Sequence, residues 1–233
     1  MSTNSTNNAR DLIRSGADRS KYLLRANIIL LIALTMIIFV VPIIPIKDNN
    51  LTRVLLGVVV ISGLFAADFS KAAYRILSSL GLVVLLVTML NLFLPDSRQL
   101  DAITFLLNTL FFIIVTIALV AHVATAKKVF GSTLLCAINS YLLIGLSLSI
   151  LFLIMDLFIP GSFLHVDSSE ANYSTFIYFG FVTLTTLGYG DITPHTVMAR
   201  SLATFTALIG QLYLVIIMAI LIGKYLNLNK PME

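Results

Sequence analysis

The segment Thr185-Thr186-Leu187-Gly188-Tyr189-Gly190-Asp191 decides the fold prediction, because its residue types imply a specific chemistry. Glycine adopts positive φ angles without steric cost. Gly188 and Gly190 alternate with larger residues, so they let successive backbone carbonyls point the same way. The Thr186 hydroxyl adds an oxygen at one end of this row. The segment therefore predicts a line of oxygen ligands suited to a dehydrated cation.

The composition indicates a membrane protein. Of the 233 residues, 58% are hydrophobic and 11% are charged, whereas soluble domains are about 25% charged. The mean hydropathy is +1.00. Too few polar groups are present to cover a globular surface, so the lipid bilayer is the expected solvent. The single cysteine, Cys136, excludes an internal disulfide, and no basic patch interleaved with aromatic residues indicates a nucleic-acid partner.

Six apolar stretches are long enough to cross a bilayer, for which about 20 residues are needed. They are residues 26–45, 51–67, 76–94, 103–123, 133–159 and 201–226. A seventh apolar run, residues 173–187, is too short to cross. Non-helical backbone at membrane depth is tolerated only where it is buried in protein or lines a cavity. We therefore predict an all-α membrane protein with six transmembrane helices, and a re-entrant helix and loop between the fifth and the sixth.

The distribution of Lys and Arg predicts the orientation. With the N-terminus in the cytoplasm, eleven of the fifteen basic residues fall on the cytoplasmic side and four fall outside. The four outer residues are Lys47, Arg53, Arg98 and Arg200. We expect a multi-pass protein of the cell membrane, with both termini in the cytoplasm and residues 173–191 at the outer face.

Residues 186–191 resemble the selectivity-filter signature of the potassium channels, whose backbone carbonyls replace the hydration shell of the ion. The resemblance extends from about residue 172 to residue 210 and keeps the order helix, filter, helix. It implies a homotetramer with K⁺ as the permeant ion, coordinated by the Thr186 hydroxyl and by the carbonyls of Thr186, Leu187, Gly188, Tyr189 and Gly190. It also implies that the filter is supported by Thr185, Asp191, Tyr178, Phe179 and Val182.

Three positions depart from the usual residues of the family. Leu187 replaces the usual valine, Tyr178 stands where members often have a tryptophan, and Val182 stands where some bacterial members have a carboxylate. A tyrosine hydroxyl at position 178 could still bind Asp191. We therefore expect the aromatic support of the filter to be altered rather than lost.

Three residues beyond the filter are candidates for gating. Gly210 falls where many members of the family have a hinge glycine, and close packing is an equal alternative because glycine is frequent at helix contacts in membranes. Leu214 and Met218 follow one and two helical turns later on the same face. We predict that these two side chains line the cavity or the gate.

The resemblance divides the chain into four parts. They are a polar cytoplasmic segment (1–25), a four-helix peripheral domain (26–130), a pore domain (131–226) and a short cytoplasmic tail (227–233). The fourth predicted span, residues 103–123, contains no Lys or Arg. Since steep voltage gating requires several charges in the membrane field, strong voltage gating is not expected. The tail is too short for a cytoplasmic ligand-binding domain.

Polar residues outside the filter region are expected to have structural roles. Asn91, Asn108 and Asn139 are predicted to form hydrogen bonds between helices. Asp48, Asp96 and Asp101 are interpreted as ordinary polar residues of the loops. The three histidines show no metal-ligand spacing.

The sequence thus predicts a potassium-selective channel with passive conduction, which is not an enzyme and needs no cofactor. Its nearest alternative keeps the pore but passes monovalent cations with weak selectivity. A membrane-embedded enzyme with Asp191 and His195 as an acid–base pair is a further alternative, although no nucleophile or metal cluster accompanies them. A non-conducting accessory subunit is the last alternative, and the intact Gly188 and Gly190 argue against it.

Overall fold

The computed structural model describes residues 21–43, 50–66, 71–93, 98–126, 131–166 and 173–228. Four expectations of the sequence fall elsewhere: the first 20 residues of the N-terminal segment, Asp48, Asp96, and the end of the tail at 229–233 lie outside the described residues.

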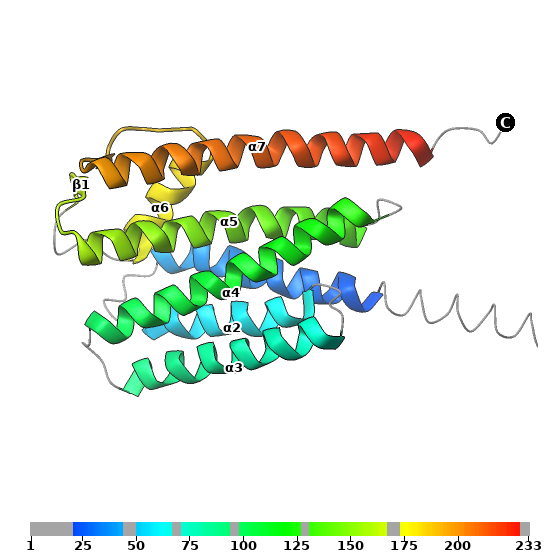
Figure 1. The fold of residues 1–233 in the computed structure, drawn as a ribbon, viewed down its shortest axis with the longest axis horizontal. Coiled ribbons are helices and arrows are strands. Elements are labelled where there is room, and N and C mark those ends of the chain that lie inside the picture. Colours follow the sequence, from blue (N-terminus) through cyan, green and yellow to red (C-terminus); the bar gives the residue numbers. More distant parts are fainter. Residues whose placement is uncertain are drawn as a thin grey trace, which may run out of the picture.

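The described part of the chain is built almost entirely from helices whose axes run roughly side by side (Figure 1). The first helical segment is Lys21–Ile43, which closes with the π-helical turn η1 (Met36–Val40) and the 3₁₀ turn η2 (Val41–Ile43). The others are α2 (Asn50–Ala66), α3 (Lys71–Phe93), α4 (Arg98–Thr125), α5 (Gly131–Phe158), α6 (Tyr173–Leu184) and α7 (Val197–Leu228). The short strands β1 (Phe163–Leu164) and β2 (Thr193–Pro194) pair antiparallel at the end of the bundle where α6 lies.

This architecture confirms the predicted fold class, an all-α membrane protein. Among the described residues, five helices are long and apolar enough to cross a membrane. They are Lys21–Ile43, Ala73–Phe93, Arg98–Thr125, Gly131–Phe158 and Val197–Lys224. The helix α2 has 17 residues, which is at the lower end of the range of about 17–25 for a spanning helix. It packs beside α3 and α4, and its role as a sixth crossing stays a prediction.

The helices α4 and α5 form an antiparallel pair that joins the first helices to the rest of the chain (Figure 1). Both have 28 residues, so each is about 42 Å long at 1.5 Å per residue. Large apolar side chains from both helices are fully buried in the core, among them Phe111 and Phe112 of α4 and Leu146, Ile150 and Phe152 of α5. The two helices thus pack against each other within one chain.

A buried polar cluster ties α2, α3 and α4 together at the end where α6 lies. The Arg53 guanidinium of α2 forms an ion pair with Asp101 of α4 at 2.7 Å. The amide of Asn91 in α3 donates to Asp101 at 2.9 Å and to the Thr104 hydroxyl at 3.1 Å. The expectation that Asp101 is an ordinary loop residue was therefore wrong, because it lies in the first turn of α4 and balances a buried arginine.

A second cluster joins the first helix to α2 and α5 near the opposite end. The Asn139 amide donates to the main-chain carbonyl and to the side-chain oxygen of Asn27, at 2.9 and 3.0 Å. Asn27 in turn donates to the Ala66 carbonyl at 2.7 Å. The predicted bonds between helices are thus present for Asn91 and Asn139. The prediction for Asn108 was wrong in its partner, since its amide donates to the Thr104 carbonyl within α4.

The far end of α7 is attached to α4 through a single side chain. The Lys224 ammonium donates to the Val123 and Ala124 carbonyls, at 2.6 and 2.8 Å. These carbonyls lie in the last turn of α4, where the helix dipole favours a cation. Lys224 therefore connects the last long helix of the chain to the helices that precede α5.

Candidate functional site

The short helix α6 lies between α5 and α7 and is held on α5 by close backbone packing. A Cβ atom at Gly180 would lie 2.1 Å from the Ser149 hydroxyl and 3.0 Å from the Ser149 Cα atom. On the same side, Phe179 is buried in an aromatic cluster, with ring centroids 4.8 Å from Phe152 and 5.3 Å from Phe163. Phe179, one of the predicted supports, thus anchors α6 to α5 and to the loop that carries β1.

The last turn of α6 leads directly into residues 186–190, the candidate filter strand. The Thr186 N–H donates to the Thr183 carbonyl and the Leu187 N–H to the Val182 carbonyl, both at 3.0 Å. This pair of bonds, with Thr186 at φ +60°, is a Schellman ending. A left-handed conformation costs a residue other than glycine about 1–2 kcal/mol, so the surrounding bonds must hold Thr186 in place. The Thr185 hydroxyl donates back to the Phe181 carbonyl at 2.7 Å.

The carbonyl of Val182 determines which way the filter strand presents its oxygens. It accepts the N–H groups of both Leu187, at 3.0 Å, and Gly188, at 3.3 Å. In a trans peptide the C=O points opposite to the N–H of the following residue, and the described residues contain no cis peptide bond. The carbonyls of Thr186 and Leu187 therefore both point away from α6. Val182, predicted as a filter support, acts through its main chain.

The backbone of the filter strand alternates in the sign of φ. Positive φ values occur at Thr186 (60°), Gly188 (57°) and Gly190 (80°), that is, at every second residue. The alternation expected from the two glycines is present, and it extends to a threonine that the sequence pattern did not single out for this role. Leu187 and Tyr189, which lie between these positions, are exposed in the single chain.

The other end of the strand is held by Tyr178 and Asp191, as the resemblance suggested. The Tyr178 hydroxyl donates to the Asp191 carboxylate at 2.5 Å, and the Ile192 N–H donates to the other carboxylate oxygen at 3.0 Å. The bond from Tyr178 lowers the pKa of Asp191, and the same bond raises the pKa of Tyr178 to about 12. The pair therefore stays a tyrosine donor and a carboxylate acceptor across the physiological pH range.

The segment after Asp191 is fastened to the loop that precedes α6. Leu164 pairs with Thr193 in the two-stranded ladder, and the His195 N–H donates to the Ser162 carbonyl at 2.7 Å. The Thr196 hydroxyl then accepts the Ala199 N–H at 3.2 Å and caps the first turn of α7. These bonds fix the exit of the strand relative to α5 and α7.

Gly210 of α7 lies against the end of α6. A Cβ atom at this position would lie 2.0 Å from the Leu184 carbonyl oxygen, so no other residue fits without moving the backbone of α6. The sequence left two roles open for Gly210, a hinge and a close packing contact, and this geometry supports the packing contact. A hinge at Gly210 stays a prediction. Leu214 and Met218 are exposed on α7, and their place in a cavity or gate stays a prediction.

Gln211 is a site residue that the sequence analysis missed. Its amide donates to the Thr186 hydroxyl at 3.2 Å, so α7 contacts the inner end of the filter strand through a polar bond. A glutamine in an otherwise apolar span, next to Gly210, was the available signal, because polar residues at membrane depth usually make specific contacts.

Comparison with known proteins finds similarity in the same segment. The model of the family described as "Ion channel" matches residues 150–226, from α5 through the filter strand into α7. Over 44 residues the chain is 48% identical to the potassium voltage-gated channel subfamily KQT member 4 of Homo sapiens, Rattus norvegicus and Mus musculus. This region is 19% of the chain and 6% of each relative. No solved structure matches the chain significantly.

The fold is that of a multi-pass, all-α membrane protein, and its residues 150–226 are similar to the ion-channel family. Within the chain, the segment that carries the site is the part similar to the ion-channel family and to these potassium channels. The chain spans only a small part of the length of the relatives it matches, so their other properties are not transferred to it.

We predict that Gly210→Ala destabilises the fold, because the added methyl group overlaps the Leu184 carbonyl. Overpacking of this kind costs about 1–3 kcal/mol, which thermal unfolding in detergent measures. Gly223→Ala, in the same helix, is the matched control, since a Cβ atom there meets nothing within 4 Å. It is expected to be neutral or slightly stabilising, since alanine is the better helix former. Equal unfolding temperatures for the two variants would contradict the packing role.

We also predict that Tyr178→Phe raises the pKa of Asp191 toward the usual value of about 3.9. The pKa of Asp191 is lower in the folded protein than in the unfolded chain. The pair therefore stabilises the fold fully at pH values above the pKa of the unfolded chain, and this stabilisation is lost as the pH falls through the pKa of the folded protein. Carboxyl NMR titration of Asp191 measures the change. Tyr74→Phe, at an exposed site on α3, should leave the titration unchanged, and an unchanged pKa in Tyr178→Phe would refute the pairing.

Proposed function

We propose that the chain is one subunit of a homotetrameric, potassium-selective channel that conducts passively. The observation that carries the proposal is the double hydrogen bond to the Val182 carbonyl, which turns the Thr186 and Leu187 carbonyls away from α6. One chain contributes one row of such oxygens, and a ring around an ion requires four copies. Rings of carbonyls of this kind replace the hydration shell of K⁺ in potassium channels.

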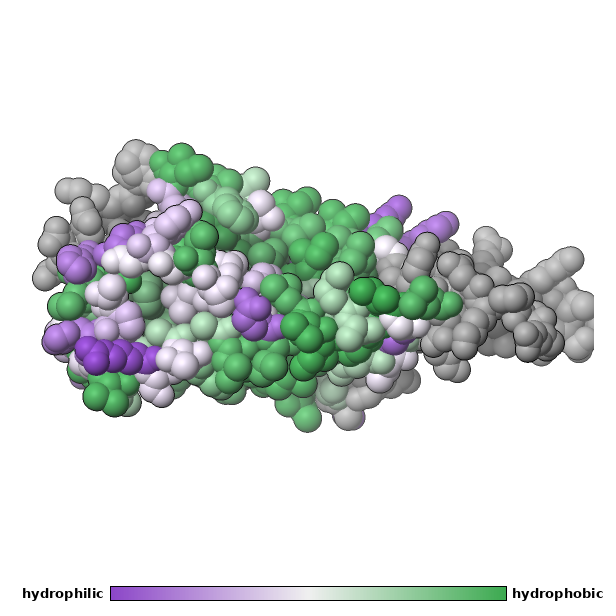
Figure 2. Space-filling view, turned by 90° about the horizontal axis from the view of Figure 1, so that it is seen from above, coloured by the Kyte–Doolittle hydropathy of each residue, from purple (hydrophilic) through white to green (hydrophobic). Residues whose placement is uncertain are grey.

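The exposed face of α7 supports assembly with further copies. Figure 2, which looks at the molecule from the α7 side, shows an apolar band across its middle and polar residues gathered toward the end that carries α6. Large apolar side chains are exposed along α7, among them Leu208, Leu212, Val215, Met218 and Ile222. In the proposed tetramer, part of this face packs against neighbouring subunits and part lines the cavity, where we place Leu214 and Met218.

The end of α6 suits a cation at the inner side of the filter. The C-terminal end of a helix carries a partial negative charge, and α6 ends directly before Thr186. The Thr186 hydroxyl lies at this end and accepts a bond from Gln211. We propose that K⁺ binds in sequence at the carbonyls of residues 186–190, with α6 favouring the ion that enters from the cavity.

A channel with weak selectivity among monovalent cations is the second candidate, and the contact of Gln211 favours it. The hydroxyl oxygen of Thr186, a predicted ligand, already accepts a hydrogen bond from the Gln211 amide at 3.2 Å. An inner site with weaker ligands would discriminate less between K⁺ and Na⁺. The enzyme alternative is not supported in the same way, because both carboxylate oxygens of Asp191 are engaged by Tyr178 and by the Ile192 main chain.

Gating, orientation and domain organisation complete the proposal. The only Lys or Arg in α4 is Arg98, its first residue, so we propose a channel without steep voltage dependence. The distribution of Lys and Arg supports both termini in the cytoplasm of a cell. Residues 26–130 would form a peripheral domain that packs on the pore domain, 131–226, of its own subunit, as the pairing of α4 with α5 supports.

The test is K⁺ flux into liposomes that contain the purified protein, with Gly188→Ala as the critical variant. We expect flux from the wild type and a loss of at least about tenfold in Gly188→Ala. Gly188 has a positive φ angle that alanine adopts only with strain, and it lies in the proposed ion path. Gly161→Ala is the matched control, since Gly161 also has positive φ (81°) and open space around it but lies outside the filter.

Equal flux in wild type and Gly188→Ala would refute the filter. Reversal potentials of the wild type with equal concentrations of K⁺ on one side and Na⁺ on the other distinguish the two candidates, since a potassium-selective channel gives a large potential and a weakly selective channel gives one near zero.

A further inference from the structure

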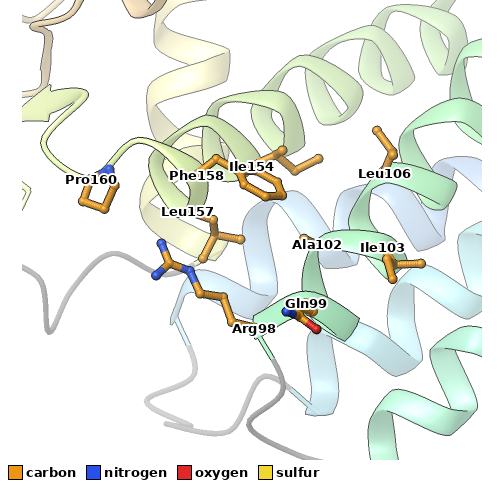
Figure 3. A pocket seen from close by; sticks show the side chains of 9 residues that line it. All are labelled: Arg98, Gln99, Ala102, Ile103, Leu106, Ile154, Leu157, Phe158 and Pro160. Carbon is orange, nitrogen blue, oxygen red and sulfur yellow. The ribbon is translucent and has the colours of Figure 1, made fainter.

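A groove of about 650 Å³ lies between the first turns of α4 and the last turns of α5, at the same end of the molecule as the filter strand (Figure 3). We call it the α4–α5 groove. Its inner surface is apolar: Ala102 and Leu106 of α4 face Ile154, Leu157 and Phe158 of α5. The volume falls in the range of about 300–1,000 Å³ that is typical of small-molecule sites.

The walls of the groove are suited to hydrocarbon rather than to water. Leu106 and Phe158 are 57% and 70% exposed, and both line the groove. The helices that form it are long and apolar enough to cross a bilayer, and in that setting the exposed Leu106 side of the groove would face acyl chains. An extended hydrocarbon chain is the occupant that such a channel would receive from that side.

The mouth of the groove has a different chemistry from its interior. Arg98 and Gln99 line it at the start of α4, and the Arg98 side chain extends from α4 across the mouth toward the α5 side (Figure 3). A guanidinium has five N–H donors in a planar fork that fits the oxygens of a phosphate. The mouth therefore presents a phosphate-binding group directly beside an apolar groove.

Among the described residues, the acidic side chains near Arg98 leave capacity for a further ligand. Asp156 of α5 interacts with it electrostatically, and a single carboxylate uses at most two of the five donors. Asp101, in the same turn of α4, is paired with Arg53 and Asn91 instead. Arg98 is exposed, so a headgroup can reach it from the membrane surface.

We propose that the α4–α5 groove binds an anionic phospholipid from the leaflet at the filter end. The phosphate is held by Arg98 at the mouth, and one acyl chain lies between α4 and α5 against Leu106, Ile154 and Phe158. Basic groups beside pockets between spanning helices recognise lipid headgroups in this way. The site is separate from the ion path and does not depend on the proposed conduction.

The absence of tryptophan from the sequence permits a direct test by fluorescence quenching. Leu106→Trp places a single fluorophore in the groove. Leu86→Trp is the matched control, because Leu86 is exposed on α3 at a similar depth. Leu86 lies seven residues before the end of α3 at Phe93, and Leu106 lies eight residues after the start of α4. Each protein is reconstituted with phosphatidylglycerol or phosphatidylcholine that carries the same brominated acyl chains.

We expect brominated phosphatidylglycerol to quench Leu106→Trp with about fivefold higher apparent affinity than phosphatidylcholine, the preference that one basic residue gives for an anionic surface. Leu86→Trp should show no preference. Adding Arg98→Gln to Leu106→Trp should remove the preference, whereas adding Arg200→Gln, a second exposed arginine at the same end, should keep it.

Two results would overturn the proposal. Equal quenching of Leu106→Trp by both lipids would show that Arg98 selects no headgroup. If neither lipid quenched Leu106→Trp while both quenched Leu86→Trp, the groove would be covered by a second copy of the chain instead of a lipid.

Discussion

The candidate site depends on the carbonyl of Val182, which accepts hydrogen bonds from two main-chain N–H groups. Backbone groups at membrane depth must be paired, because no water is present to satisfy them. By accepting the N–H groups of Leu187 and Gly188, one oxygen ends α6 and satisfies the first donors of the strand that follows. The same bonds turn the adjoining carbonyls outward, so the helix ending and the proposed ion ligands are served by one arrangement.

The surrounding helices keep that arrangement in place from three sides. Gly180 allows α6 to contact Ser149 of α5, and Gly210 allows α7 to contact the Leu184 carbonyl. Tyr178 holds the far end of the strand through Asp191. The left-handed Thr186 is unfavourable in isolation, and its persistence requires this support. The strand is therefore positioned by backbone contacts that tolerate only glycine, and by a few polar side chains.

Much of this could be predicted from the sequence, for identifiable reasons. Long apolar runs predict the spanning helices, and the alternating glycines at 188 and 190 predict a segment with positive φ angles. The bond between Tyr178 and Asp191 was expected from the resemblance to the potassium channels, whose members often have a tryptophan at the position of Tyr178. What failed depended on which helices become neighbours: Asp101 was expected in a loop because it falls between the predicted spans 76–94 and 103–123, and its partner Arg53 is 48 residues away in the sequence. The partner predicted for Asn108 was wrong, and Gln211 was missed as a site residue. In both cases, periodicity does not reveal where a polar side chain finds its partner.

The central claim is that the carbonyls of residues 186–190 are ligands of a monovalent cation. A crystal structure of the protein grown with Rb⁺, with its anomalous scattering recorded, tests this most directly. The account predicts Rb⁺ peaks in single file on an axis shared by four chains, next to the Thr186, Leu187, Gly188 and Tyr189 carbonyls. Peaks elsewhere, or carbonyls of Thr186 and Leu187 that point toward α6, would contradict it.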